Sequence, residues 1–354
     1  MKPLEGKRVL VTGGTGSLGK VLVRRLLTGE MGTPKQIYVF SRDEAKQHFM
    51  RLEYLKKKSA TDDVIYKNFQ NLLSFRIGDV RDFHSVSAML RKADVVFNAA
   101  ALKQVPTCEY FPYEAVQTNI GGPENIIRAI KEHDLDIETV MGISTDKACK
   151  PVNVMGMTKA IQERVFIRAN LDCPKTRFVA VRYGNVLASR GSVIPFFHEQ
   201  IKSGGPVTIT TVDMTRFLLS LNKAVDTIFA ALQRANPGET FIPQVPSSKV
   251  TDIADILIGK RKIKKVVTGI RPGEKVHEIL VSEEEVHRTV DLGDYYAIQP
   301  ILPEIKKPRK EKPSLKKEYS SADNLMNKKD LERLMRANKL MIGDRLVEDG
   351  EFLG

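Results

Sequence analysis

The most constraining feature of the sequence is a regular alternation of short apolar segments with longer segments of helical spacing, from Arg8 to about Tyr183. The apolar segments are rich in β-branched residues and show little polar alternation, which is typical of strands buried on both faces of a parallel sheet. They lie at residues 8–12, 36–41, 72–77, 93–99, 138–144 and 177–182. This alternation predicts βαβ units, and therefore an α/β fold with a doubly wound parallel sheet.

A glycine-rich loop, "VTGGTGSLGK", joins the first predicted strand to the first helix. Gly13, Gly16 and Gly19 permit a tight turn and the close approach of a pyrophosphate to the helix N-terminus. Because the loop follows a strand, opens a helix and begins a βαβ series, it predicts a Rossmann-like dinucleotide site rather than a merely structural turn. The neighbouring loop residues expected to contact the cofactor are Thr15, Ser17 and Leu18.

The end of the second strand bears on the choice of dinucleotide. Ser41 and Arg42 stand where an acidic residue would bind the ribose 2′-hydroxyl of NAD, and a hydroxyl with a guanidinium suits a 2′-phosphate. We therefore expect NADP, while Asp43 keeps NAD open as the less favoured cofactor. Further cofactor contacts are expected near the ends of the third and fourth strands, at Asp79, Val80, Ala99, Ala100, Ala101 and Lys103.

The regular alternation ends after Asn185, where turn-rich stretches begin. We predict an NADP-binding Rossmann domain at 1–185, to which part of 215–240 returns, and a smaller, mainly substrate-binding α/β lobe at 186–302. A basic tail with a short C-terminal helix is predicted at 303–354. From about Pro303 the chain is rich in lysine and proline, and we expect this part to be mobile.

Composition and charge argue against several classes of partner. The net charge is +13, but the lysine-rich runs at 55–58, 259–265 and 306–317 contain no aromatic residue for base stacking, so we expect no nucleic acid. No run approaches 18 apolar residues, so no membrane span is expected. The three cysteines fit no disulfide framework, which predicts a reduced, cytoplasmic protein with inert, buried thiols at Cys108 and Cys149. The six histidines show no ligand spacing, and no metal is predicted.

The stretch "STDK" at the end of the fifth strand holds the candidate acid–base residues. Ligands of open α/β sheets lie at the carboxyl ends of the strands, which places Thr145, Asp146 and Lys147 at such a site. An aspartate beside a lysine in a closed site can divide the roles of acid and base if neighbours shift their pKa values. Taken alone, the same residues fit an ordinary polar turn equally well.

Seven motifs then occur in order between about Lys7 and Gln299: "VTGGTGSLG", "FSRDE", "NAAALKQVP", "STDKACKPVNVMGMTKA", "RYGNVLASRGSVIPFF", "MTRF" and "RPGEKVHEIL". Together they closely resemble the UDP-N-acetylglucosamine 4,6-dehydratases of bacterial polysaccharide biosynthesis, which are extended short-chain dehydrogenase/reductases. The resemblance implies a lyase that oxidises C4 of UDP-N-acetylglucosamine, removes water across C5 and C6, and returns the hydride to C6. The product is a UDP-4-keto-6-deoxy-N-acetylhexosamine. The resemblance also implies a homo-oligomer, here expected to be of the type without an N-terminal membrane module.

The resemblance assigns roles to the residues at the strand end. Asp146 is the acid that assists loss of the C6 hydroxyl, Lys147 is the base at C5, and Thr145 hydrogen-bonds the sugar oxygen at C4. Related hexose dehydratases usually carry a glutamate at the position of Lys147, and the lysine is as in the branch that this chain resembles.

Met155 departs from the wider pattern of the short-chain dehydrogenases. Most of them carry a tyrosine here, which deprotonates the hydroxyl, four residues before a lysine that binds the nicotinamide ribose. Met155 and Lys159 share one helical face, but a thioether has no proton to exchange. The C4 hydroxyl must therefore lose its proton through Asp146, a water or a relay by Thr145. Because several members of the branch also carry methionine here, Met155 does not by itself indicate an inactive enzyme.

The motifs "MTRF" and "RPGEK" supply candidate anion-binding residues, Arg216, Arg271, Glu274 and Lys275. Arginine forks bind a diphosphate bidentately, and a carboxylate suits a ribose diol or a sugar hydroxyl, although a surface ion pair remains an alternative for each. By resemblance, the further substrate contacts are Lys103, Asn185, Ser192 and Thr208.

Two other functions stay open. A UDP-hexose C4 epimerase would share the first oxidation but needs neither an acid at C6 nor a base at C5, so the Asp146–Lys147 pair argues against it. A non-catalytic NADP-binding regulator has only Met155 in its favour. The sequence also leaves open whether C5 is inverted or retained.

Overall fold

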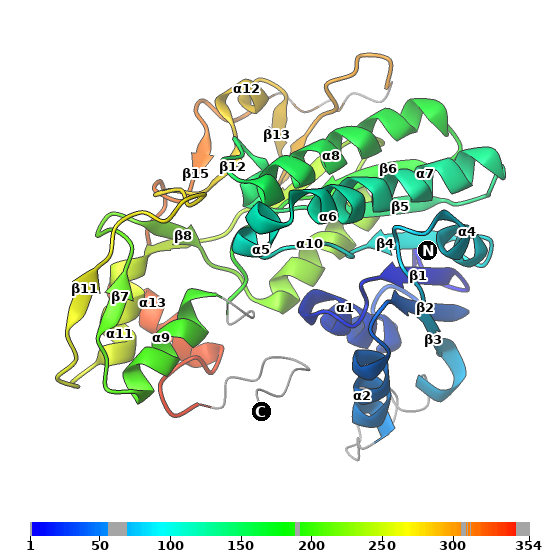
Figure 1. Cartoon of the computed structure of the whole chain (residues 1–354). Coiled ribbons are helices and arrows are strands. Elements are labelled where there is room, and N and C mark those ends of the chain that lie inside the picture. Colours follow the sequence, from blue (N-terminus) through cyan, green and yellow to red (C-terminus); the bar gives the residue numbers. More distant parts are fainter. Residues whose placement is uncertain are drawn as a thin grey trace.

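The computed structural model describes residues 2–55, 69–187, 192–305, 309, 311 and 313–344. Within these ranges the main element is a nine-stranded sheet with the order β13-β14-β9-β6-β5-β4-β1-β2-β3 (Figure 1). Its strands are β1 (Arg8–Thr12), β2 (Gln36–Ser41), β3 (Leu73–Ile77), β4 (Val95–Asn98), β5 (Thr139–Ile143), β6 (Arg177–Val181), β9 (Thr240–Pro243), β13 (Thr289–Asp291) and β14 (Tyr295–Ile298). The six strands expected from the sequence are confirmed, each boundary within two residues.

Strands β9 through β3 run parallel, and β14 and β13 continue the sheet in the antiparallel sense. Val9 and Val11 belong to the hydrophobic cluster under α1 (Ser17–Leu27) and α10 (Leu221–Arg234). Leu10 belongs to the cluster under α4 (Phe83–Leu90), α7 (Gly122–Glu132) and α8 (Val154–Asp172). Because alternate residues of a strand face opposite sides, helices cover both faces of the sheet, as the doubly wound α/β fold requires.

A smaller body packs beside the main sheet around a third apolar cluster (Figure 1). It contains α9 (Val193–Lys202), α11 (Val250–Ile258) and α13 (Lys328–Ala337). Two two-stranded sheets accompany these helices: β7 (Val207–Ile209) with β11 (Lys265–Val267), and β8 (Thr215–Phe217) with β10 (Ser247–Lys249). A third, β12 (Ile279–Val281) with β15 (Tyr319–Ser320), contributes Leu280, Val281 and Tyr319 to the cluster that contains Val9 and Val11 of the main sheet. The remaining helices are α2 (Glu44–Leu55), α5 (Val105–Tyr110), α6 (Pro112–Val116), α12 (Glu283–Val286), a π-helix (Gln117–Gly121) and a 3-10 helix (Asp146–Ala148).

The division into two lobes stays a prediction, but β9, β13 and β14 join the main sheet although most of 186–302 was expected in the smaller lobe. The expectation of a mobile tail is wrong for residues 313–344. Tyr319 packs on Phe217 with ring centroids 5.0 Å apart, and Leu331 and Met335 of α13 are fully buried. Apolar residues spaced along α13 therefore anchor this basic segment. Among the described residues, none of the helices combines the length and apolar character needed to cross a membrane.

Candidate active site

The glycine loop is pressed against the end of β4. Gly13 has a φ of +65°, and a Cβ built on it would lie 2.7 Å from the backbone nitrogen of Ala100. A Cβ on Gly19 would lie 2.5 Å from the carbonyl oxygen of Gly13. Both positions therefore exclude a side chain, and the packing brings the predicted cofactor residues of the loop next to Ala99 and Ala100. This cradle of backbone at the start of α1 fits a dinucleotide pyrophosphate.

The predicted selectivity residues lie at the adjacent end of β2. The exposed guanidinium of Arg42 is 3.6 Å from the carboxylate of Asp79, which also binds Arg81 at 2.7 Å. The Ser41 hydroxyl accepts a hydrogen bond from Gln47. An exposed cation beside a strand-end hydroxyl gives this edge the chemistry for binding an anion.

Asp146 is completely buried at the carboxyl end of β5. Its Oδ1 accepts hydrogen bonds from the Thr145 hydroxyl at 2.8 Å and from Lys147 Nζ at 3.3 Å. Its Oδ2 has no hydrogen-bond partner among the described residues. The backbone nitrogen of Asp146 donates to the carbonyl of Tyr183 at 3.0 Å, so the end of β6 holds this turn in place.

A residue that the sequence analysis did not single out, Glu278, completes this cluster. Its Oε1 lies 3.3 Å from Lys147 Nζ and 3.8 Å from the Nε of Arg216. The sequence did contain a signal for it, because Glu278 directly precedes the apolar residues of β12 in "HEIL". A charged residue at such a buried position needs a partner of opposite charge, since unpaired charges are rarely buried.

These contacts set the charges of the cluster. Burial raises the pKa of Asp146, and the attraction of Lys147 offsets this only in part. Burial would lower the pKa of Lys147, but the carboxylates of Asp146 and Glu278 outweigh it and the net shift is upward. Burial would likewise raise the pKa of Glu278, but Lys147 and Arg216 outweigh it and the net shift is downward. Relative to isolated side chains, Asp146 therefore binds its proton more readily, while Lys147 and Glu278 hold their charges more strongly.

Met155 and Lys159 face the interior from the first turns of α8, 4% and 5% exposed. The Lys159 nitrogen donates to the carbonyl of Ile143 and to Gln162, and burial lowers its pKa to about 8. Met155 packs in a small apolar cluster with Cys108 and Ala115. The groups that the structure places together at the end of β5 are instead Thr145, Asp146 and Lys147.

The start of α8 is fixed to both the strand end and the "RPGEK" loop. A Cβ on Gly156 would lie 2.2 Å from the carbonyl oxygen of Lys147, so only glycine permits this approach. The side chain of Asn153 caps the helix by accepting from the Gly156 nitrogen and donates to the carbonyl of Gly273 at 2.8 Å. Lys275 donates to the carbonyl of Cys149, so the loop that carries Arg271 and Glu274 is anchored beside the acid–base cluster.

The other predicted substrate residues are more widely spread. Arg271 is exposed and lies 5.8 Å from the ring of Phe196, and Glu274 accepts from Thr210 at 3.3 Å. Thr208 bonds Gln200, and Lys103 is exposed. Asn185 Oδ1 and Ser192 Oγ are buried with no hydrogen-bond partner among the described residues, so both have acceptor capacity to spare. Residues 188–191 of the same motif lie outside the described residues.

Three buried charged residues, Arg182, Glu163 and Glu285, lie next to the candidate site. Arg182 binds Glu163 of α8 at 2.6 Å and Glu285 of α12 at 2.8 Å. Ser144, which directly precedes the strand-end residues, donates to Glu163. Burial raises the pKa of the Cys149 thiol to about 12, which makes it unreactive near neutral pH.

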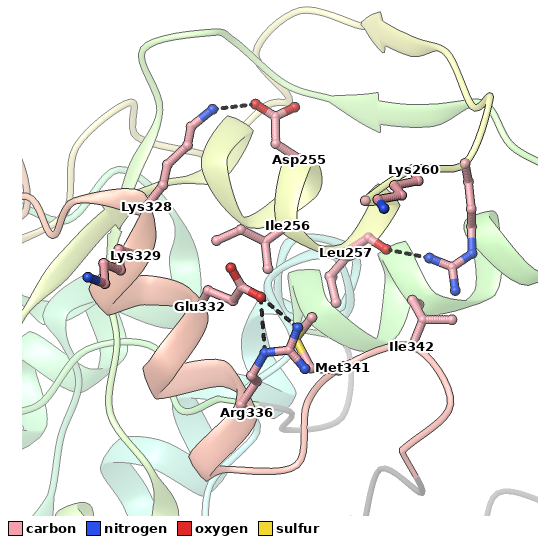
Figure 2. Close-up of a pocket in the computed structure, with 12 residues that line it drawn as sticks. Asp255, Ile256, Leu257, Lys260, Lys328, Lys329, Glu332, Arg336, Met341 and Ile342 are labelled. Atoms are coloured by element: carbon pink, nitrogen blue, oxygen red, sulfur yellow. Dashed lines mark hydrogen bonds and ion pairs between the residues drawn. The ribbon is translucent and has the colours of Figure 1, made fainter.

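A pocket of about 710 Å³ lies elsewhere, between α11 and α13 (Figure 2). Several of its charged residues are already paired within the chain: Lys328 with Asp255 at 2.9 Å and Arg336 with Glu332 at 2.6 Å. None of the predicted site residues lines it. The described residues contain no group of three or more His, Cys, Asp or Glu side chains that could hold a metal ion.

Residues 9–300 match the model of a family described as polysaccharide biosynthesis protein, and the chain belongs to this family. It is 44% identical over 299 residues to a UDP-glucose 4-epimerase of Rickettsia bellii, covering 82% of each chain. It is 42% identical over 300 residues to an inverting UDP-N-acetylglucosamine 4,6-dehydratase of Campylobacter jejuni, covering 84% of each. The chain is therefore an enzyme of the nucleotide-sugar dehydratase and epimerase group of extended short-chain dehydrogenase/reductases, as the sequence motifs predicted.

Solved structures share the fold of this chain. The X-ray structure of Pen from Bacillus thuringiensis has a TM-score of 0.84 and 33% identity, covering 96% of this chain and 99% of that one. A dTDP-glucose 4,6-dehydratase from Streptomyces venezuelae, solved with NAD, has a TM-score of 0.62 and 20% identity, covering 76% and 86%. The second likeness shows the Rossmann-like fold alone.

Proposed function

We propose that this enzyme is a 4,6-dehydratase that converts UDP-N-acetylglucosamine to a UDP-4-keto-6-deoxy-N-acetylhexosamine for a bacterial surface polysaccharide or glycan. The observation that carries the proposal is the contact of a buried Asp146 with Lys147 at the carboxyl end of β5. Dehydration needs an acid at C6 and a base at C5, whereas C4 epimerisation needs neither. The epimerase name of the Rickettsia relative keeps epimerisation as the second candidate.

The proton on the C4 hydroxyl has a route that does not need a tyrosine. The Thr145 hydroxyl donates to Asp146 Oδ1, so the C4 proton can pass through Thr145 to ionised Asp146. A raised pKa makes Asp146 a stronger base when ionised and helps it to keep the proton until the C6 hydroxyl leaves. The same proton then leaves with the C6 hydroxyl as water. Asp146 thus serves both steps, and Met155 need not take part.

Lys147 accounts for the remaining proton transfers, which occur at C5. When bound, the nicotinamide supplies the redox chemistry by accepting the C4 hydride and returning it to C6. Lys147, once neutral, takes the C5 proton, which the C4 ketone acidifies, and gives a proton back to C5 at the end. Arg216, Arg271 and Glu274 are proposed to hold the UDP part, with Lys103, Asn185, Ser192 and Thr208 as further contacts.

NADP is the proposed cofactor. The support is the exposed Arg42 beside Ser41 at the end of β2, which suits a 2′-phosphate. Lys159, whose pKa burial lowers to about 8, is proposed to bind the nicotinamide ribose.

Homo-oligomerisation and a cytoplasmic location stay predictions. Exposed Tyr110, Phe111 and Tyr113 on neighbouring turns supply an apolar surface that a second copy could cover.

Incubation with UDP-N-acetylglucosamine in deuterated water, followed by proton NMR, tests the proposal. A dehydratase places deuterium at C5 and yields a 6-deoxy-4-keto product, whose stereochemistry reports inversion or retention at C5. An epimerase leaves the carbon-bound hydrogens unexchanged and yields the C4 epimer. A regulator leaves the sugar unchanged. Either of the last two results refutes the dehydratase.

A further inference from the structure

Glu278 is buried opposite Lys147 and is held firmly in place. Its side chain is 3% exposed, and its Oε2 has no hydrogen-bond partner among the described residues. Its backbone nitrogen donates to the hydroxyl of Ser321 at 2.9 Å, and its carbonyl accepts from the Ser321 nitrogen at 2.8 Å. The segment beside β15 therefore fixes where this carboxylate lies, independently of the acid–base pair.

We infer that Glu278 is a positioning residue for Lys147, because it holds the side-chain nitrogen against Asp146 and sets the charge that this nitrogen carries. The inference deepens the proposed function and rests on it only for the role of Lys147 as the base at C5.

The geometry leaves Lys147 one direction for a substrate. An ammonium has three donors, and two of them point to Asp146 and Glu278, at 3.3 Å each. The third can face the sugar. Without Glu278 the long side chain would lose one of the two contacts that choose its rotamer, and the nitrogen would spend less time in the productive position.

Several charged groups surround the Lys147 ammonium. Asp146, Glu278 and Arg216 act on Lys147, and Lys275 interacts with both Glu278 and Lys147. The pKa of Asp146 is raised and that of Glu278 is lowered, so of the two carboxylates Glu278 holds its negative charge beside the ammonium to lower pH. A base must first lose its own proton, so Glu278, together with Asp146, raises the pH at which Lys147 becomes competent.

The test compares Glu278→Gln with the intact chain. Glutamine keeps the size of the side chain and the backbone bonds to Ser321 but removes the charge. An opposite charge within about 4–6 Å typically shifts a pKa by about 1–3 units, so the pKa of Lys147 should fall by about one unit or more. The rising limb of the pH profile for C5 deuterium exchange should move to lower pH by the same amount, while the maximal rate falls about tenfold or more through lost positioning.

A second readout does not depend on turnover. The Lys147 side chain is 22% exposed, so brief acetylation at a series of pH values, read by mass spectrometry at Lys147, reports its pKa directly. Wild-type protein that exchanges no deuterium would refute the proposed function, while the acetylation profile would still decide the role of Glu278.

Two further variants, Glu283→Gln and Glu278→Asp, test the same role of Glu278. Glu283→Gln is the matched control, since that side chain is 71% exposed on α12 and pairs only loosely with Lys150, at 3.8 Å; both profiles should stay unchanged. Glu278→Asp keeps the charge but withdraws it by one methylene, so a smaller shift of the same sign is expected, and it serves if the glutamine variant does not fold. A folded Glu278→Gln protein with the wild-type acetylation profile, or an equal shift in Glu283→Gln, overturns the inference.

Discussion

Replacing Asp146 with asparagine should abolish most activity without dismantling the site. Asparagine has nearly the same shape, and its Oδ1 can still accept from Thr145 and Lys147, the two contacts made by the carboxylate. The Nδ2 would occupy the place of Oδ2, which has no hydrogen-bond partner among the described residues. The loss should therefore reflect proton transfer, which is typically worth about 10²–10⁴ in rate, or roughly 3–5 kcal/mol of activation free energy.

Product formation is measured by proton NMR, and folding by the thermal unfolding midpoint. The substitution also has a signature in stability. Because the pKa of Asp146 is raised above its unfolded value of 3.8, the folded state holds the proton more tightly, and this favourable contribution is lost as pH rises through the folded pKa. The stability of the variant relative to wild type should thus increase as pH rises from that unfolded value. A folded variant that turns over within tenfold of wild type, with a pH-independent stability difference, would show that Asp146 carries no catalytic proton.

Three further predictions follow from buried or strained positions. Gly13→Ala should prevent cofactor binding, followed by the fluorescence of reduced NADP, because its Cβ would meet backbone at 2.7 Å; Gly6→Ala has a similar φ of +68° with no atom within 4 Å and should bind normally. Lys159→Met should be more stable than wild type below pH 8, by about 3 kcal/mol, because the pKa of Lys159 is lowered to about 8 from 10.5; chemical denaturation should show this advantage disappearing between those values. Arg182→Leu should cost about 3–5 kcal/mol in denaturant unfolding, because it leaves two buried carboxylates unpaired, and a loss below 1 kcal/mol would contradict this.

Much of the fold and part of the site could be predicted from residues close together in the chain. The strands were found because burial on both faces leaves near-continuous apolar runs, and the glycine loop because its turn and helix start are local. Thr145, Asp146 and Lys147 were placed correctly at the end of β5, since the end of a strand is also a local property. In contrast, β9, β13 and β14 are short strands whose sequence alone does not reveal that they extend the main sheet.

The order of residues therefore specifies six strands of the main sheet, the glycine loop and the identity of the candidate acid–base pair. Tertiary structure alone decided that Lys147 meets Glu278, 131 residues away, and that Arg182 binds carboxylates from α8 and α12. It also decided the charges, because a pKa depends on burial and on neighbours brought together by folding, neither of which is written in the order of residues. For that reason an aspartate beside a lysine fits an ordinary turn when only the sequence is considered. In the folded chain the same two residues form a buried cluster with Glu278.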